Sequence, residues 1–269
     1  MEELTLDQLA QKYTAVYLDN SILNRDSNMS AQRQTPYFRR GISIPSVAER
    51  LGAAESFRDV KQSVLNRQAG HAQRMSVAVE TYGSLRSAPL IVKEYEELVN
   101  HFEVVLMFLI KRSGRKSGLK EEKLREILSS HQQIYDRLLL RSPADAGADN
   151  LTRYLQAERL HLSLDNYFIK KHPSSSTSAG DSSLVSYALR EASPAVAIVT
   201  ADFDIVNLVR NYGLRSHRKE LPAAFNGKGK ETVTVYFPAD SGWNPELGLQ
   251  FMCNTEGEQA VYGTRSRYL

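Results

Sequence analysis

Two aspartates, Asp202 and Asp204, come directly after an apolar run in the stretch AIVTADFDIVNL. The run, Ala195 to Val199, is typical of a buried strand, and apolar residues at helical spacing resume after the aspartates. A helix N-cap explains an aspartate at this place, because its side chain accepts hydrogen bonds from the first backbone N–H groups of the helix. A metal site at the carboxyl end of a strand explains it equally, so both interpretations stay open on this stretch alone.

Three further acidic residues take comparable places in the chain. Asp19 ends a short apolar strand over residues 15–18, and Asp181 begins the helix that leads into the 195–199 strand. Glu94 lies in the first turns of a long helix that starts near Ser87. Clustered carboxylates repel one another unless a cation neutralises them. Mg²⁺ and Mn²⁺ take carboxylate oxygens, and two such ions about 3.5–4 Å apart can activate a water and stabilise the leaving oxygen of a phosphodiester.

These acidic residues need a scaffold that brings distant stretches together. Apolar runs predict strands at 15–18 and 195–199, and the alternation of Val233, Val235 and Phe237 predicts one at 232–237. Helices separate these strands, which indicates an α/β fold with a mostly parallel sheet. Sites in such sheets collect at the carboxyl ends of the strands, so Asp19 and Asp202 lie close together if their strands are neighbours.

The periodicity of apolar residues and the turn signals predict the remaining elements. A Ser/Gly-rich connector is expected at 172–181, and one weaker strand candidate follows in the C-terminal region. Ser87 and Asp181 are expected as helix N-caps. Helices are expected over about 57–85 with an interruption near Gly70, 87–114, 119–141, 149–170, from 181 onward, and 204–211.

The stretches VYLDNSIL, PLIVKEYEEL, DSSLVSYAL and AIVTADFDIVNL, in this order, resemble the motifs of PIN-domain nucleases. The resemblance covers mainly residues 13–23, 87–100 and 180–237. It implies a Rossmann-like, three-layer fold with a mostly parallel central sheet, and a site in which acidic residues bind Mg²⁺ or Mn²⁺. It also implies hydrolysis of RNA, or of DNA in some relatives, that leaves a 5′-phosphate and a 3′-hydroxyl.

Carried over residue by residue, the resemblance implies four catalytic, metal-binding acids and one auxiliary acid for a second metal or its water. Glu97, one turn along the same helix face, is an alternative to the second of these acids. In sequence order, the four acids are Asp19, Glu94, Asp181 and Asp202, and the auxiliary one is Asp204.

Three polar residues accompany this set. Thr200 would orient a carboxylate or a water through its hydroxyl. Asn20, followed by Ser21, occupies the place where the family usually carries a small hydroxyl residue, a departure that alters the contacts expected for Asp19 or the substrate.

The spacing between the acids exceeds that of compact members of the family. We therefore expect a single PIN-like domain over 1–269, with helical insertions at about 24–86 and 105–172 and a C-terminal extension at about 238–269. Basic residues in polar segments are candidate contacts to a phosphate backbone, although solvated loops explain them as well. They are Arg39, Arg40, Arg112, Arg115, Lys116, Arg215, Arg218 and Lys219.

The bulk composition is that of an ordinary soluble protein. The 269 residues carry a net charge of +3 and a single cysteine, which fits a reducing cytoplasm. No apolar run reaches the roughly 18 residues of a membrane span, and the acidic N-terminus does not resemble a secretory signal. Zinc-hydrolase histidine spacing, a nucleophile elbow and a Walker loop are lacking, and a dehalogenase-type phosphatase would need an aspartate where Ser21 stands.

Two functions are therefore expected from different classes. The first is a metal-dependent endonuclease, with RNA favoured over DNA as its substrate. The second is a catalytically weak PIN-like module that binds nucleic acid or assembles with protein, with the inserted helices as a homo-oligomer interface. The apolar run VVLMFLI at 104–110 would belong to the core or to such an interface. Each acid taken singly also has an ordinary explanation as a cap, a turn residue or solvated surface.

Overall fold

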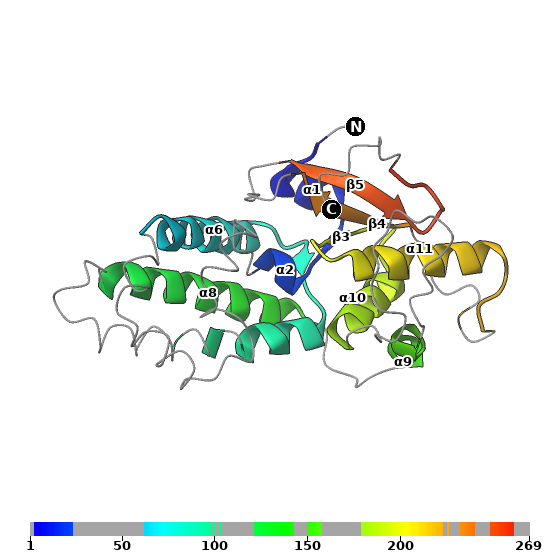
Figure 1. Ribbon diagram of the computed structural model, residues 1–269, viewed down its shortest axis with the longest axis horizontal. Coiled ribbons are helices and arrows are strands. Elements are labelled where there is room, and N and C mark those ends of the chain that lie inside the picture. Colours follow the sequence, from blue (N-terminus) through cyan, green and yellow to red (C-terminus); the bar gives the residue numbers. More distant parts are fainter. Residues whose placement is uncertain are drawn as a thin grey trace, which may run out of the picture.

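A five-stranded sheet with the order β2-β1-β3-β4-β5 forms the centre of the computed structural model (Figure 1). The structure describes residues 3–23, 62–97, 99–100, 103, 121–142, 150–157, 179–222, 225, 232–239 and 248–260. Four strands run parallel, and the fifth pairs antiparallel with β4. Their bounds are β1 Ala15–Leu18, β2 Leu85–Arg86, β3 Ala195–Val199, β4 Thr232–Pro238 and β5 Leu249–Asn254.

The strands β1, β3 and β4 are buried along almost their whole length, as their apolar sequences require. The α/β class, the mostly parallel sheet and the strands at 15–18, 195–199 and 232–237 are thus confirmed. β5 corresponds to the weaker C-terminal strand candidate. It lies inside the expected C-terminal extension, yet it forms the edge of the central sheet. The two-residue strand β2 was not predicted.

The helices pack against one another and against the sheet. α6 and α8 pack along each other, and α10 packs against α9, α11 and β3 (Figure 1). α1 begins with a capping box, in which Thr5 and Gln8 bond each other's backbone N–H groups. The bounds are α1 Leu6–Lys12, α2 Asn20–Leu23, α6 Gln62–Thr81, a helical stretch at 89–97, α8 Glu121–Arg141, α9 Asn150–Ala157, α10 Ala179–Arg190 and α11 Phe203–His217.

Two expectations about helices need correction. α6 continues through Gly70 without the expected interruption, because a helical glycine costs only about 1 kcal/mol and packing against α8 outweighs it. α11 extends to His217, well beyond the expected end near residue 211. α8 agrees with the prediction for 119–141, and the run at 104–110 lies outside the described residues.

Neither residue expected as an N-cap has that role. The buried Ser87 hydroxyl donates to the carbonyl of Leu18 at 2.6 Å instead of capping the helix that follows. The β1–β2 pairing covers only Val16 and Tyr17, so the Ser87 hydroxyl satisfies the next carbonyl of β1. This bond also ties the start of the 89–97 helix to the end of β1. Asp181 is the third residue of α10 and therefore lies inside its first turn.

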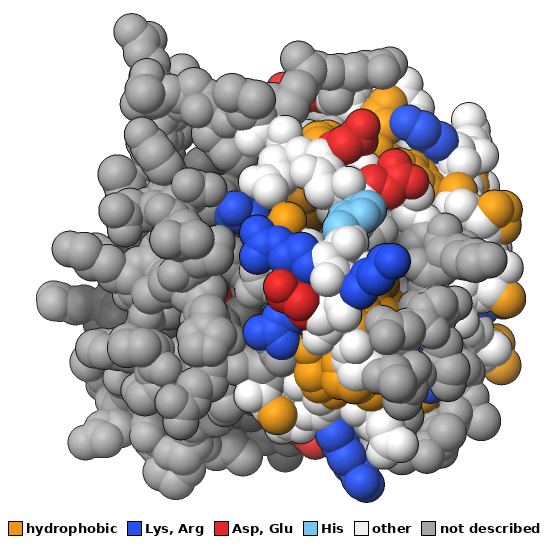
Figure 2. Space-filling view, turned by 90° about the vertical axis from the view of Figure 1, so that its right-hand side faces the viewer, with side chains coloured by type: hydrophobic (Ala, Val, Ile, Leu, Met, Phe, Trp, Pro, Cys, Tyr) orange, Lys and Arg blue, Asp and Glu red, His pale blue; other side chains and the backbone are white. Residues whose placement is uncertain are grey.

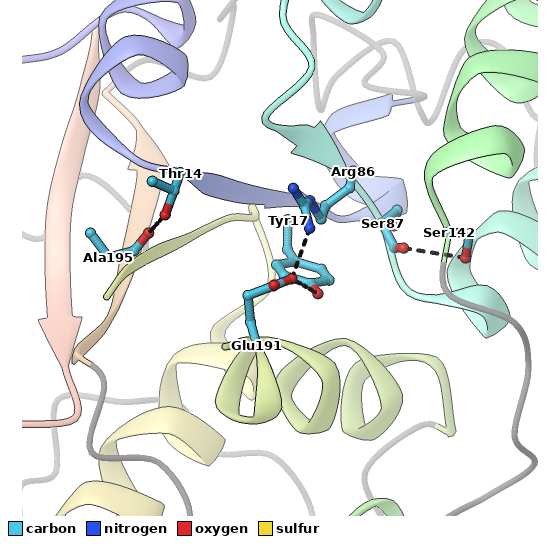
Figure 3. Close-up of polar contacts among 7 residues, drawn as sticks. All are labelled: Thr14, Tyr17, Arg86, Ser87, Ser142, Glu191 and Ala195. Carbon is cyan, nitrogen blue, oxygen red and sulfur yellow. Dashed lines mark hydrogen bonds and ion pairs between the residues drawn. The ribbon is translucent and has the colours of Figure 1, made fainter. Parts of the chain in front are cut away.

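A polar cluster joins β1, β2 and the end of α10 (Figure 3). The Tyr17 hydroxyl donates to Glu191 Oε2 at 2.8 Å, and Arg86 Nη1 donates to the same oxygen at 2.9 Å. Burial, and next the bond to Glu191, raise the pKa of Tyr17 well above its usual value, so the phenol stays protonated. The cluster fixes the C-terminal end of α10 to the sheet.

Replacing Gly213 by alanine should destabilise the fold by about 1–3 kcal/mol, the range of overpacked sites. A Cβ at this position of α11 would stand 2.5 Å from the carbonyl oxygen of Thr255, a backbone atom just beyond β5. Urea unfolding measures the loss. The matched control is Gly83→Ala, where a Cβ would meet nothing within 4 Å. Equal stability of the two variants would contradict this contact.

Within the described part of the chain, no helix combines the length and apolar character that crossing a membrane requires.

Candidate metal centre

The carboxyl ends of β1 and β3 lie next to each other at the centre of the sheet. Leu18 pairs with Val199, and the Asp19 N–H group donates to the Val199 carbonyl at 3.1 Å, so Asp19 and Thr200 leave the sheet side by side. β1 lies between β2 and β3, so the order in which successive strands are added to the sheet reverses at β1. Ligand sites of open α/β sheets form at such switch points.

Asp19 is a buried carboxylate, with 4% of its surface exposed. Its Oδ2 accepts from the Thr200 hydroxyl at 2.9 Å, from the Ser21 N–H group at 3.3 Å and from the Ser21 hydroxyl. Burial raises the pKa of Asp19, and the charge of Asp202 adds to this rise, whereas the bonds from Ser21 and Thr200 oppose it. Asp19 is thus a carboxylate whose negative charge a nearby cation would stabilise.

Hydrogen bonds of Ser21 and Thr200 also hold the turn between β3 and α11. The Thr200 hydroxyl accepts from the Asp202 N–H group at 2.9 Å, and the Ser21 hydroxyl accepts from the Ala201 N–H group at 2.9 Å. The same two side chains therefore position Asp19 and the chain that carries Asp202.

Three aspartates from two helices come together beside this turn. One carboxylate oxygen from each of Asp181, Asp202 and Asp204 lies within 4.8 Å of the others, so this group could hold a metal ion. Asp202 is the N-cap of α11, and its Oδ1 accepts from the Asp204 N–H group at 2.9 Å. The cap role considered for Asp204 therefore belongs to Asp202. Oxygen-only donors of this kind suit Mg²⁺ and Mn²⁺.

Glu94 approaches the same place from the 89–97 helix. Its Oε2 accepts from Asn20 Nδ2 at 3.1 Å. A Cβ built on Gly180 would lie 3.0 Å from Glu94 Oε1, so the Glu94 carboxylate lies against the first turn of α10. Asp181 belongs to the same turn. Glu97 is exposed one turn further on, and Glu96 faces Tyr135 of α8. Of the two candidates for the second acid, Glu94 is the one next to α10.

The structure thus groups three of the five predicted acids, Asp181, Asp202 and Asp204, while Asp19 lies at the adjoining strand end and Glu94 lies against the first turn of α10. Sequence reasoning did not single out Gly180, although it directly precedes Asp181, because nothing local indicates that a glutamate from another helix needs its space. It also left Asn20 without a partner, since Glu94 is 74 positions away in the chain.

The three basic candidates that the structure describes, Arg215, Arg218 and Lys219, do not share this location. Arg218 is the C-cap of α11, and Arg215 donates to the Tyr154 hydroxyl of α9 at 2.8 Å. These residues and Lys219 lie at the opposite end of α11 from Asp202, about 22 Å away for a helix of 15 residues. Although they follow Asp202 closely in sequence, these three residues therefore do not lie beside the acids. At that end of the molecule, Lys and Arg side chains are interspersed with Asp and Glu (Figure 2).

The other basic candidates lie outside the described residues: Arg39, Arg40, Arg112, Arg115 and Lys116.

Comparison of the chain with protein-family models, with curated proteins and with solved structures gave no match.

Proposed function

We propose that this chain is a Mg²⁺- or Mn²⁺-dependent endonuclease with a PIN-type fold, and that it hydrolyses RNA in preference to DNA. The observation that carries the proposal is the convergence of acids from separate stretches on the switch point of the sheet. Three of them hold carboxylate oxygens within 4.8 Å of one another, and Asp19 and Glu94 adjoin them.

The donor set fits a hard divalent cation. Asp181, Asp202 and Asp204 would hold it, with Asp19 and Glu94 as the neighbouring carboxylates. When bound, such an ion polarises a phosphodiester and lowers the pKa of a water. The chain's own residues supply the positioning: Thr200 and Ser21 orient Asp19, and the α11 cap holds Asp202.

Incubation with labelled single-stranded RNA and single-stranded DNA tests the proposal. With Mn²⁺ or Mg²⁺, we expect internal cleavage of RNA that exceeds cleavage of DNA, with 5′-phosphate ends. Excess chelator should abolish the cleavage, because carboxylates alone cannot polarise the phosphodiester as a bound cation would. The Asp202→Asn protein, purified in the same way, controls for a contaminating nuclease.

Two outcomes would contradict the proposal. Cleavage that persists in chelator would exclude metal-dependent chemistry. Binding of Mn²⁺ without cleavage of either substrate would favour the catalytically weak binding or assembly module.

A further inference from the structure

Glu94, the second of the predicted acids, is carried by a different helix from the three aspartates. Asp181, Asp202 and Asp204 are carried by α10 and by the start of α11, whereas Glu94 comes from the 89–97 helix. A glutamate side chain has several rotatable bonds, so a fixed carboxylate position requires contacts at the carboxylate itself. Asn20 provides one such contact, and Gly180 leaves the space that the carboxylate occupies.

Asn20 supplies a hydrogen-bond donor. Its Nδ2 lies 3.1 Å from Glu94 Oε2, and only the amide nitrogen can face a carboxylate without repulsion, which settles the orientation of the amide. Asn20 directly follows Asp19 and begins α2, so it links the carboxyl end of β1 to Glu94. Its Oδ1 is buried without a hydrogen-bond partner among the described residues. Stability alone does not favour a half-satisfied buried amide, whereas positioning of Glu94 accounts for it.

Gly180 supplies space. A Cβ at this position would stand 3.0 and 3.1 Å from the two carboxylate oxygens of Glu94, and 3.1 Å from Ile91 Cδ1. These separations are tighter than ordinary contacts, so a larger residue would push the carboxylate away from α10. Glycine lets Glu94 lie against the first turn of this helix, where backbone N–H groups favour negative charge. Asp181 is the next residue, so the same contact brings two acids together.

We propose that Asn20 and Gly180 are positioning residues that hold the Glu94 carboxylate against the start of α10, beside the three aspartates that would hold a divalent cation. The inference rests on the proposed metal-dependent function. It adds that the affinity of the site for a cation depends on two residues that are not themselves acids. Asn20 holds Glu94 with an amide donor, at the position where the PIN-domain nucleases that this chain resembles usually carry a hydroxyl residue.

Calorimetric titration of the full chain with Mn²⁺ tests the role of Asn20 through a double-mutant cycle. Asn20→Leu, which keeps the size but removes the donor, should weaken Mn²⁺ binding about 10-fold, at the lower end of the range for outer contacts of metal ligands. Glu94→Ala should weaken it at least as much. The double variant should bind no more weakly than Glu94→Ala, because Asn20 acts through Glu94. Independent, additive losses would overturn the inference, since a general structural role predicts them.

A second pair of variants tests Gly180. Gly180→Ala should weaken Mn²⁺ binding about 10-fold, because the added Cβ displaces the Glu94 carboxylate. Gly70→Ala is the matched control, because it also lies in a helix and its Cβ would meet only the flexible end of Arg74. Equal affinity of the Gly180→Ala protein and the parent would overturn this part of the inference.

The readout separates the inference from the proposed function. If the parent chain binds no Mn²⁺, the metal-dependent function fails and the positioning role fails with it. If the parent binds Mn²⁺ and Asn20→Leu binds it equally, the positioning role fails and the function stands. Asn20→Ser, too short to reach Glu94, replaces the leucine variant if circular dichroism shows that the latter does not fold.

Discussion

Replacing Asp202 by asparagine should reduce metal-dependent cleavage by about 100-fold or more, while the fold stays unchanged. The loss exceeds the 10- to 100-fold effect of residues that only support metal ligands, because Asp202 contributes a carboxylate to the group itself. Asparagine caps helices as well as aspartate does, so the bond to the Asp204 N–H group survives. The substitution therefore removes the charge and keeps the cap. Initial cleavage rates and thermal unfolding of both proteins measure the two effects.

Two control variants make this result specific. Asp136→Asn removes an equally charged but exposed carboxylate from α8, and it should leave cleavage unchanged. Asp202→Ala removes the charge and the cap together, so it should lose cleavage and also about 1 kcal/mol of stability. Cleavage by Asp202→Asn at the parent rate would show that Asp202 is a cap alone.

The Asp19→Asn protein should lose cleavage as well, yet in chelator at neutral pH it should be at least as stable as the parent. The asparagine oxygen can accept the bonds from Thr200 and Ser21, while the substitution removes a buried negative charge. Excess Mn²⁺ should stabilise the parent more than the variant. At 100 times the dissociation constant, binding contributes about 2.7 kcal/mol, or roughly 5 °C in Tm.

The pH dependence follows from the raised pKa of Asp19, caused first by burial. Because the folded state holds this proton more tightly than the unfolded chain, Asp19 contributes a loss of stability to the metal-free parent as pH rises above about 4, until the folded-state pKa is passed. The Asp19→Asn protein lacks this loss. Urea unfolding between pH 4 and 8 in chelator measures the difference, with Asp7→Asn on α1 as an exposed control. A variant less stable than the parent at pH 8 would contradict this prediction.

The parts of the fold that could be predicted are those written in local patterns. β1 and β3 are apolar runs, β4 alternates apolar residues with threonine, and their order with intervening helices predicts the parallel sheet. The adjacency of β1 and β3 then places Asp19 beside the Asp202 turn. β2 could not be predicted, since two residues carry no periodicity and pair only because β1 lies beside them.

The errors concern partners that lie far away in sequence. Ser87 has the type and position of a cap, but the hydroxyl satisfies the Leu18 carbonyl, 69 positions away. Asp181 and Asp204 also have the residue type and the position expected of an N-cap. Asp181 instead lies within the first turn of α10, and Asp202 is the residue that caps α11. Arg218 follows the acids closely in sequence, but a straight helix converts that short separation into distance.

The cluster of Tyr17, Arg86 and Glu191 has a consequence for the opposite end of α10. This helix has 12 residues and is about 18 Å long, and it behaves as a rigid rod over that length. The bonds to Glu191 fix the C-terminal end of α10 to the sheet, and Asp181 lies near the N-terminal end of this helix. Tyr17 and Arg86, although remote from the acids, therefore help to fix the position of the helix that carries Asp181.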